Sequence, residues 1–354
     1  MMRKIFIIIL AFSWLKGCYN APVQEVNLDP LAAKALYDTT SSYYTDFSTY
    51  PKNIADLPIG IFDVNTASTA ALDATVMLDR FDNITGGEQP DAIRDFAGEH
   101  FIYYTTLSDA DSIYDANGQL DIHDAAIKNT LFLVGDKCAQ GEKERAKIVI
   151  AAGNITRATG LDDTRAMLEA SGSGVKLIGV IEEGVKGLLD ILENQPMLNY
   201  SVGLIADSLT IASGAYQQTM KDVLAERGRR SSFPFVCQST SAPDSLHRNS
   251  LEKAFAAMID SHYADGQPKP ICALIIDGGV DDCLAAEFQE IINNYRSKRI
   301  NGNYPYRAVI NDKLIYINPS ECAAMECYRV LRKDNNLALR IGEQQVAHYS
   351  DLPM

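Results

Sequence analysis

The sequence lacks most of the features that would point directly to a function. It has 354 residues, only one tryptophan, five scattered histidines and no CxxC pair, so a zinc site has little support, and we expect neither a metal nor a cofactor. Basic residues are also scarce. The 32 lysines and arginines are outnumbered by 46 aspartates and glutamates, and the resulting net charge of −14 argues against a nucleic-acid surface, which needs a basic field.

The N-terminus reads as a targeting segment. Arg3 and Lys4 precede an apolar run at 5–15, which is too short to span a bilayer as a helix. The run ends in Leu-Lys-Gly-Cys, which resembles a bacterial lipoprotein signal with Cys18 as the acylated first mature residue. The alternative is a secretory peptide cleaved nearby. We predict a signal at 1–17, a tether at 18–56, and a protein of the bacterial cell envelope, periplasmic or outer-membrane, that touches the membrane through its lipid only.

Six further cysteines have irregular spacings, and a chain of this length does not need disulfides to fold. They are Cys138, Cys237, Cys272, Cys283, Cys322 and Cys327. We expect most of these thiols to be buried, with the last two on one helix and too badly phased to pair.

The stretch 147–192 contains two α/β units in succession. Residues 147–152 form an apolar run rich in β-branched residues that stops at Gly153, as a buried parallel strand does at the end of its sheet. A helix follows through Leu168, then a strand at 177–181 and a second helix. Similar strand patterns recur at 59–62, 100–104, 202–206, 233–237 and 271–276. This alternation predicts an α/β fold, in which ligands bind beyond the carboxyl ends of the strands.

Several of these strand ends resemble the cofactor-independent glutamate racemases of the aspartate/glutamate racemase superfamily. The matching segments are Gly-Ile-Phe-Asp at 60–63, Ala-Gly-Asn-Ile at 152–155, Ile-Gly-Val-Ile-Glu at 178–182 and Ser-Gly-Ala-Tyr at 213–216. The resemblance covers about 57–333. It implies two similar doubly wound, flavodoxin-like domains with mainly parallel sheets and a site in the interdomain cleft. The implied domains are 57–152 with 271–333, and 153–270, followed by a C-terminal tail at 334–354.

The two catalytic cysteines of that family are absent. The resemblance places the first at Gly153 and the second at Gly278. Racemisation at an α-carbon needs an acid/base group on each face, and glycine supplies none. Cys283 lies five positions past the second site, where a helix-packing role is the competing interpretation. We therefore expect thiol-based racemisation to be lost.

Two aspartates are the remaining catalytic candidates. Asp63 and Asp277 follow predicted strands, so both are expected beside the cleft, where burial that raised one pKa would allow acid/base work. The alternative for Asp277 is a capped helix start, with Asp281 and Asp282 in the first turn.

The remaining candidates would bind a ligand. Asn154 matches the family residue that hydrogen-bonds the substrate's backbone groups. Arg157, one turn into the next helix, would suit a carboxylate or phosphate, unless it pairs with Asp162 or Asp163. The full predicted binding set is Asp63, Asn65, Gly153, Asn154, Arg157, Gly278 and Gly279.

Three functional hypotheses follow. The first is a lipid-anchored racemase homologue that binds a small carboxylate or amino-acid-like ligand without racemising it. The second is an active isomerase or lyase of altered mechanism using Asp63 and Asp277. The third is a structural or interaction module of the envelope. The sequence leaves the ligand open, and also whether the chain forms a homo-oligomer.

Overall fold

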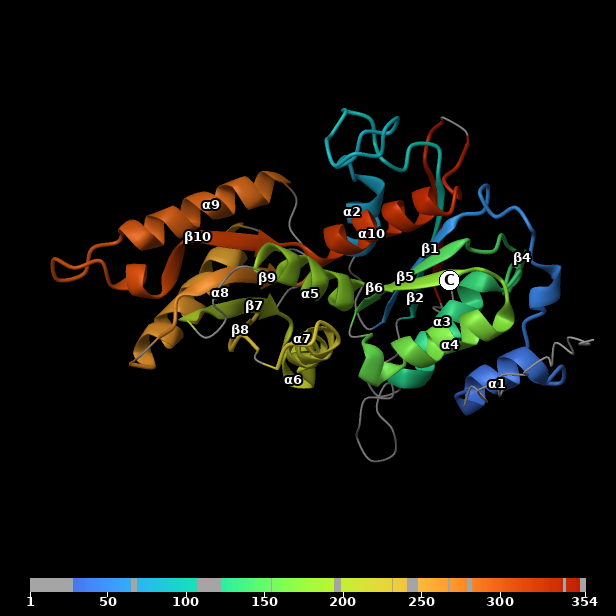
Figure 1. The fold of residues 1–354 in the computed structure, drawn as a ribbon, viewed down its shortest axis with the longest axis horizontal. Coiled ribbons are helices and arrows are strands. Elements are labelled where there is room, and N and C mark those ends of the chain that lie inside the picture. The colour runs from blue at the N-terminus through green and yellow to red at the C-terminus, as the bar shows by residue number, and fades with distance from the viewer. Residues whose placement is uncertain are drawn as a thin grey trace, which may run out of the picture.

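The buried β-branched runs of the sequence form two parallel sheets (Figure 1). The computed structural model describes residues 28–64, 69–106, 122–153, 155–193, 199–230, 232–240, 248–266, 268–278, 282–339 and 342–350. The first sheet has the order β11-β2-β1-β5-β6, and the second has the order β10-β9-β7-β8. All of their neighbouring strands run parallel. The chain is therefore an α/β protein with two lobes, one built on each sheet.

The first lobe contains strands β1 (Ile59–Val64), β2 (His100–Thr106), β5 (Ile148–Gly153), β6 (Lys176–Gly179) and β11 (Gln345–Ser350). One face of its sheet is covered by α1 (Pro30–Tyr37), α3 (Ile122–Val134) and α4 (Leu161–Ser171). The other face is covered by α2 (Ala70–Val76) and α10 (Pro319–Lys333). A small antiparallel hairpin, β3 (Lys137–Cys138) and β4 (Gly141–Glu142), follows α3. This two-sided cover is why its central strands are apolar throughout.

The second lobe contains strands β7 (Ser201–Ala206), β8 (Phe235–Ser239), β9 (Ile271–Ile276) and β10 (Ile310–Ile317). Helices α5 (Val180–Ile191) and α7 (Ala215–Glu226) pack on one face, and α8 (Arg248–Ala264) and α9 (Asp282–Ser297) on the other. The short elements are α6 (Ser208–Ser213), η1 (Phe47–Thr49), η3 (Arg157–Thr159) and η6 (Pro305–Ala308). The sequence prediction of doubly wound, mainly parallel sheets is confirmed.

Helices α5 and α10 join the lobes. α5 contributes Val180 to the core of the first lobe and Leu188 to the core of the second. Glycine lets the two helices approach closely: a Cβ at Gly184 would lie 2.7 Å from Pro319 Cβ, and one at Gly187 would lie 2.8 Å from Cys322 Sγ. The contact is therefore tight where the chain passes between lobes.

The sheets divide the chain differently from the predicted domain limits. β6 belongs to the first sheet with β5, whereas β9 belongs to the second sheet with β7. The prediction of 153–270 as one domain, with 271–333 returned to the other, therefore disagrees with the strand order. By sheet membership, the second lobe runs from β7 to β10. The predicted limits followed the resemblance, and strand–helix alternation in the sequence sets the elements but does not decide which sheet each strand joins.

Both predicted tails are partly folded. A helix, α1, begins at Pro30 within the predicted tether, and its Leu31 and Ala35 are buried against the first lobe. Tyr50 donates a hydrogen bond to Ala146 O. The described part of the predicted tether, from residue 28, is thus packed on the body. At the other end, β11 adds a strand to the first sheet, so the predicted tail is part of the fold.

A buried ion pair lies at the amino end of the first sheet, just before β2 and β5 begin. The Lys147 ammonium lies 2.6 Å from Glu99 Oε2 and donates to Ala55 O and Asn336 O, at 2.7 and 2.8 Å. Both side chains are almost fully buried. The pair ties segments before β1 and after α10 to the start of β5.

Candidate interdomain site

The first half of the candidate site is the carboxyl end of β1 and β5. These strands are neighbours, and their register pairs Asp63 with Ala152 and Val64 with Gly153. Asp63 is only 4% exposed, so its carboxylate sits inside the strand end instead of in solvent. The structure therefore brings together two of the predicted site residues, Asp63 and Gly153.

The backbone of Gly153 leaves no room for a side chain. Its φ of +74° lies in the left-handed region, which L-residues other than glycine rarely adopt. A Cβ at this position would lie 2.7 Å from Val64 O and 3.0 Å from Asp63 Oδ1. The position that the resemblance assigns to a nucleophilic cysteine is therefore shaped for glycine.

The second half of the site is the carboxyl end of β9 and the start of α7. Asp277 follows β9, and its amide donates to Ile205 O at 2.9 Å. Tyr216 is fully buried, and its hydroxyl donates to Asp277 Oδ1 at 2.8 Å. Burial raises the pKa of Asp277 to about 6; the Tyr216 hydrogen bond opposes this rise and the charge of Asp207 adds to it. Asp277 can thus carry a proton near neutral pH.

Asp277 gives a prediction for stability. Because its pKa is about 6 in the folded protein and 3.8 ordinarily, folding gains most when the carboxyl is protonated, below pH 3.8. That contribution is lost as the pH rises through about 6. Urea titrations at pH 4 and 7 should show that Asp277→Asn shrinks the loss of unfolding free energy between these values by about 1–3 kcal/mol. The exposed control Asp312→Asn should leave that loss unchanged. If the wild type and Asp277→Asn lose the same unfolding free energy between pH 4 and pH 7, the assignment is contradicted.

Arg157 is held by carboxylates of the protein itself. Its guanidinium donates to Glu182 at 2.8 Å and to Glu226 of α7, and it lies 4.0 Å from Asp162. The sequence left two interpretations of Arg157, a ligand contact or an ion pair. The observed contacts are ion pairs, and the one with Glu226 joins the two lobes. Glu182 and Glu226 were not predicted as its partners.

Glu182 is the centre of this ion-pair cluster. It is buried, and besides Arg157 it receives Arg165 at 2.8 Å and Lys186 at 2.9 Å. Burial alone would raise the pKa of Glu182, but the surrounding cations hold it at about 2. The carboxylate therefore stays charged and fixes the η3 segment against α5.

A cavity of about 460 Å³ lies between η3 of the first lobe and the start of α7 in the second. Its walls are mostly small or polar side chains that can donate or accept hydrogen bonds. The lining residues are Thr156, Ala158, Thr159, Ser213, Gly214, Ala215, Gln217, Gln218 and Lys221. Ser213 to Ala215 belong to the Ser-Gly-Ala-Tyr segment at 213–216 that resembles the racemases. The others carry no sequence signal, because their role depends on two lobes meeting.

Gln217 stands out among the lining residues. Its Nε2 is 3.3 Å from Cys237 Sγ, while its Oε1 is buried and has no hydrogen-bond partner among the described residues. Buried polar atoms normally have a partner in protein or water. Gln217 is therefore a candidate contact for a bound molecule.

The other predicted residues are placed less fully. Gly278 follows β9 with a φ of +83°, also in the left-handed region. Asn65, Asn154, Gly279 and Cys18 lie outside the described residues, as do Val280 and Asp281 of the proposed capped helix start. Cys283 falls within α9. Asp63 lies near the end of β1 and Asp277 follows β9, strands of different sheets, so the proposed pair of aspartates would have to act across the lobes.

The five cysteines whose side chains the structure describes are free. Cys272 and Cys327 are buried, while Cys138, Cys237 and Cys322 are partly buried. Burial raises the pKa of Cys322 to about 12 and that of Cys272 to about 11, so neither is a thiolate at neutral pH. The last two cysteines share α10 unpaired, as predicted.

Within the described ranges, no group of three or more His, Cys, Asp or Glu side chains is placed to hold a metal ion. No helix in the same ranges has the length and apolar character needed to cross a membrane.

Together the two lobes define an α/β protein with a cavity between them, near the carboxyl ends of parallel strands. Solved glutamate racemases are similar to this chain. The enzyme from Francisella tularensis subsp. tularensis SCHU S4, in complex with D-glutamate, is 20% identical with a TM-score of 0.49 over 85% of this chain and 90% of that one. The enzyme from Thermus thermophilus, in complex with β-chloro-D-alanine, is 18% identical with a TM-score of 0.46 over 84% and 88%. Searches against protein families and curated proteins found no match.

Proposed function

We propose that this protein binds a small carboxylate or amino-acid-like ligand in the cavity between η3 and α7 and does not racemise it. The observation that carries the proposal is the polar cavity of about 460 Å³, a size typical of small-molecule sites. Its walls offer the Lys221 ammonium and the amide of Gln217, beside the hydroxyls of Thr156 and Thr159, which bond to each other. These groups suit a carboxylate and the polar groups beside it.

The backbone at the end of β5 supports the proposal that the protein does not racemise its ligand. The racemase-like frame of the sequence puts a proton-transferring thiol at 153, where the backbone accommodates only glycine. The second thiol position is Gly278. Without an acid/base group on each face of the α-carbon, the proton cannot be removed on one side and returned on the other.

Membrane attachment is part of the same proposal. The lipoprotein-like signal before Cys18 would place a lipid at the first mature residue and hold the protein in the bacterial envelope. The folded part of the chain, with its ligand cavity, would then be exported and held at the membrane.

Lys221 provides the test of ligand binding. Calorimetric titration with D- and L-glutamate should show saturable binding of at least one enantiomer. Lys221→Gln should weaken it about 10- to 150-fold, since a charged hydrogen bond contributes roughly 1.5–3 kcal/mol. Lys253→Gln, an exposed change on α8, is the matched control and should bind like the wild type. If neither enantiomer of glutamate binds, or if Lys221→Gln binds equally well, the cavity is not the site.

The alternative of an altered isomerase or lyase is favoured by one observation. Asp277 is bonded to Tyr216 and has a pKa of about 6, as a general acid or base near neutral pH requires. Asp63→Asn and Asp277→Asn would then each have to abolish the turnover found. The envelope-module alternative would leave the cavity without a small-molecule ligand.

A further inference from the structure

Strand β11 is an edge of the first sheet in the part of the chain that the structure describes. It pairs with β2, and none of the other described strands adjoins it. Its sequence, Gln-Val-Ala-His-Tyr-Ser, has no lysine, aspartate, glutamate or proline, the residues that usually protect an edge strand from pairing. The opposite edge, β6, has four residues and carries Lys176, which pairs with Asp334. Only the β11 edge of this sheet is both long and uncharged.

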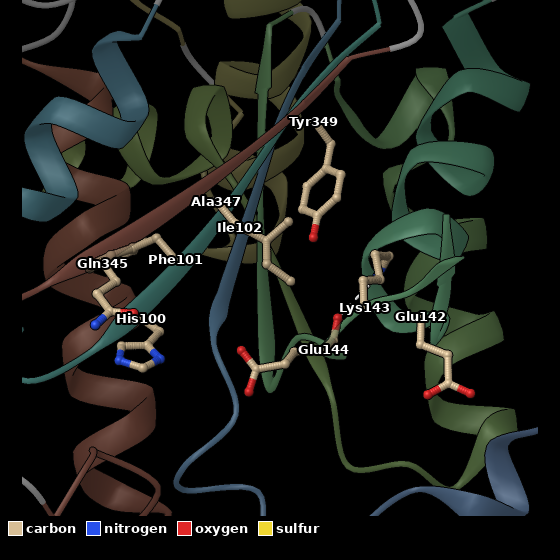
Figure 2. Close-up of a pocket in the computed structure, with 9 residues that line it drawn as sticks. All are labelled: His100, Phe101, Ile102, Glu142, Lys143, Glu144, Gln345, Ala347 and Tyr349. Carbon is tan, nitrogen blue, oxygen red and sulfur yellow. Dashed lines mark hydrogen bonds between the residues drawn. The ribbon is translucent and has the colours of Figure 1, made fainter. Parts of the chain in front are cut away.

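A groove of about 480 Å³ runs beside this edge (Figure 2). β11 contributes Gln345, Ala347 and Tyr349, alternate residues that share one face of the strand. The lining residues from β2, from the end of the hairpin and from the two residues after it are His100, Phe101, Ile102, Glu142, Lys143 and Glu144. In Figure 2 the Ile102 and Tyr349 side chains project into the middle of the groove, and the hairpin residues lie across from β11. The groove thus combines an apolar floor with a polar far wall.

The charge that this groove offers to a ligand is negative. The Lys143 ammonium is already bound, because it donates to Gly135 O at 2.6 Å, Glu144 O at 3.2 Å and Leu133 O at 3.3 Å. It also lies over the Phe132 ring, 4.8 Å from its centroid. Glu142 and Glu144 on either side of it are exposed. With the chain's net charge of −14, these carboxylates favour a cationic partner.

We propose that β11 binds an extended cationic polypeptide segment of a partner protein as an added strand. The backbone groups of every second residue of β11 point away from β2 and would pair with the segment. The alternate side chains of the segment would lie over Ile102 and Ala347, and its basic side chains would reach Glu142 and Glu144. This surface is separate from the cavity between the lobes and does not depend on the function proposed for it.

A second copy of this chain is the competing occupant of the edge. An antiparallel β11 pair would bring together two molecules that each carry a charge of −14, which disfavours it. Charge complementarity therefore selects the cationic segment.

The test uses a fluorescein-labelled peptide of alternating lysine and valine and the full chain. Anisotropy titration at low salt should show saturable binding, and the same peptide with glutamate for lysine should not bind. Two further peptides carry N-methyl groups on all lysines or on all valines. Strand addition predicts that one of the two loses at least tenfold in affinity, because only one set of amides faces β11.

Protein variants complete the test. E142Q/E144Q should weaken peptide binding about 3- to 10-fold, the effect of two exposed charge contacts, and should reduce its salt dependence. E169Q/E193Q, which neutralises two exposed glutamates elsewhere, should bind like the wild type, and circular dichroism should show all of these proteins folded. Equal binding of both N-methylated peptides, no effect of E142Q/E144Q, or no peptide binding would overturn the proposal. So would sedimentation showing a dimer that the peptide disrupts, since a second copy would then occupy the edge.

Discussion

Replacing Gly153 by cysteine should destabilise the protein by about 2–4 kcal/mol and should not create an active thiol. The cost has two parts. A non-glycine residue in the left-handed region costs roughly 1–2 kcal/mol. A Cβ only 2.7 Å from Val64 O and 3.0 Å from Asp63 Oδ1 requires β1 or β5 to shift, which adds a cost of similar size.

Gly172 offers a matched control for Gly153. Its φ is +65°, but a Cβ there would meet no atom within 4 Å. Gly172→Ala should therefore lose only about 1–2 kcal/mol, while Gly153→Ala should lose more, and the difference between them isolates the steric overlap. Urea unfolding measures all three variants. A Gly153→Cys protein as stable as Gly172→Ala would mean that the strand end adapts easily and that glycine is not required there.

Much of the fold can be predicted from the sequence because strands buried on both faces appear as continuous apolar runs. The apolar runs predicted as strands form β5, β7 and β9, with bounds close to the predicted ones. The predicted strand at 177–181 is shorter, since Val180 and Ile181 begin α5 and pack on either side of the lobe junction. β11 was missed because a half-exposed edge strand has no continuous apolar run.

The candidate site could be predicted only where it lies on strand ends. Asp63 and Gly153 are neighbours because β1 and β5 are neighbours, and Asp63 is buried because helices cover both faces of this sheet. Arg157 shows the limit of this reasoning: its carboxylate partners Glu182 and Glu226 come from α5 and α7, far along the chain. The cavity wall formed by Gln217 and Lys221 depends in the same way on how the lobes meet.

Loss of α-proton chemistry is the largest effect that we expect. Glycine at 153 and 278 offers no proton donor or acceptor, and general acid/base groups typically contribute 10²–10⁴ each to the rate of a proton transfer. Asp277 is the strongest substitute, with a pKa of about 6, but its carboxylate accepts a hydrogen bond from Tyr216 of α7 in the second lobe. One such group cannot serve both faces of an α-carbon.

The most direct measurement is therefore α-hydrogen exchange. The protein is incubated with D-glutamate and separately with L-glutamate in deuterated water, at concentrations that saturate the binding measured by calorimetry, and the α-proton signal is followed by NMR. We predict no exchange and no interconversion above a protein-free blank for either enantiomer. Deuterium incorporation that requires the protein and is abolished by Asp63→Asn or Asp277→Asn would contradict this account and identify a working isomerase.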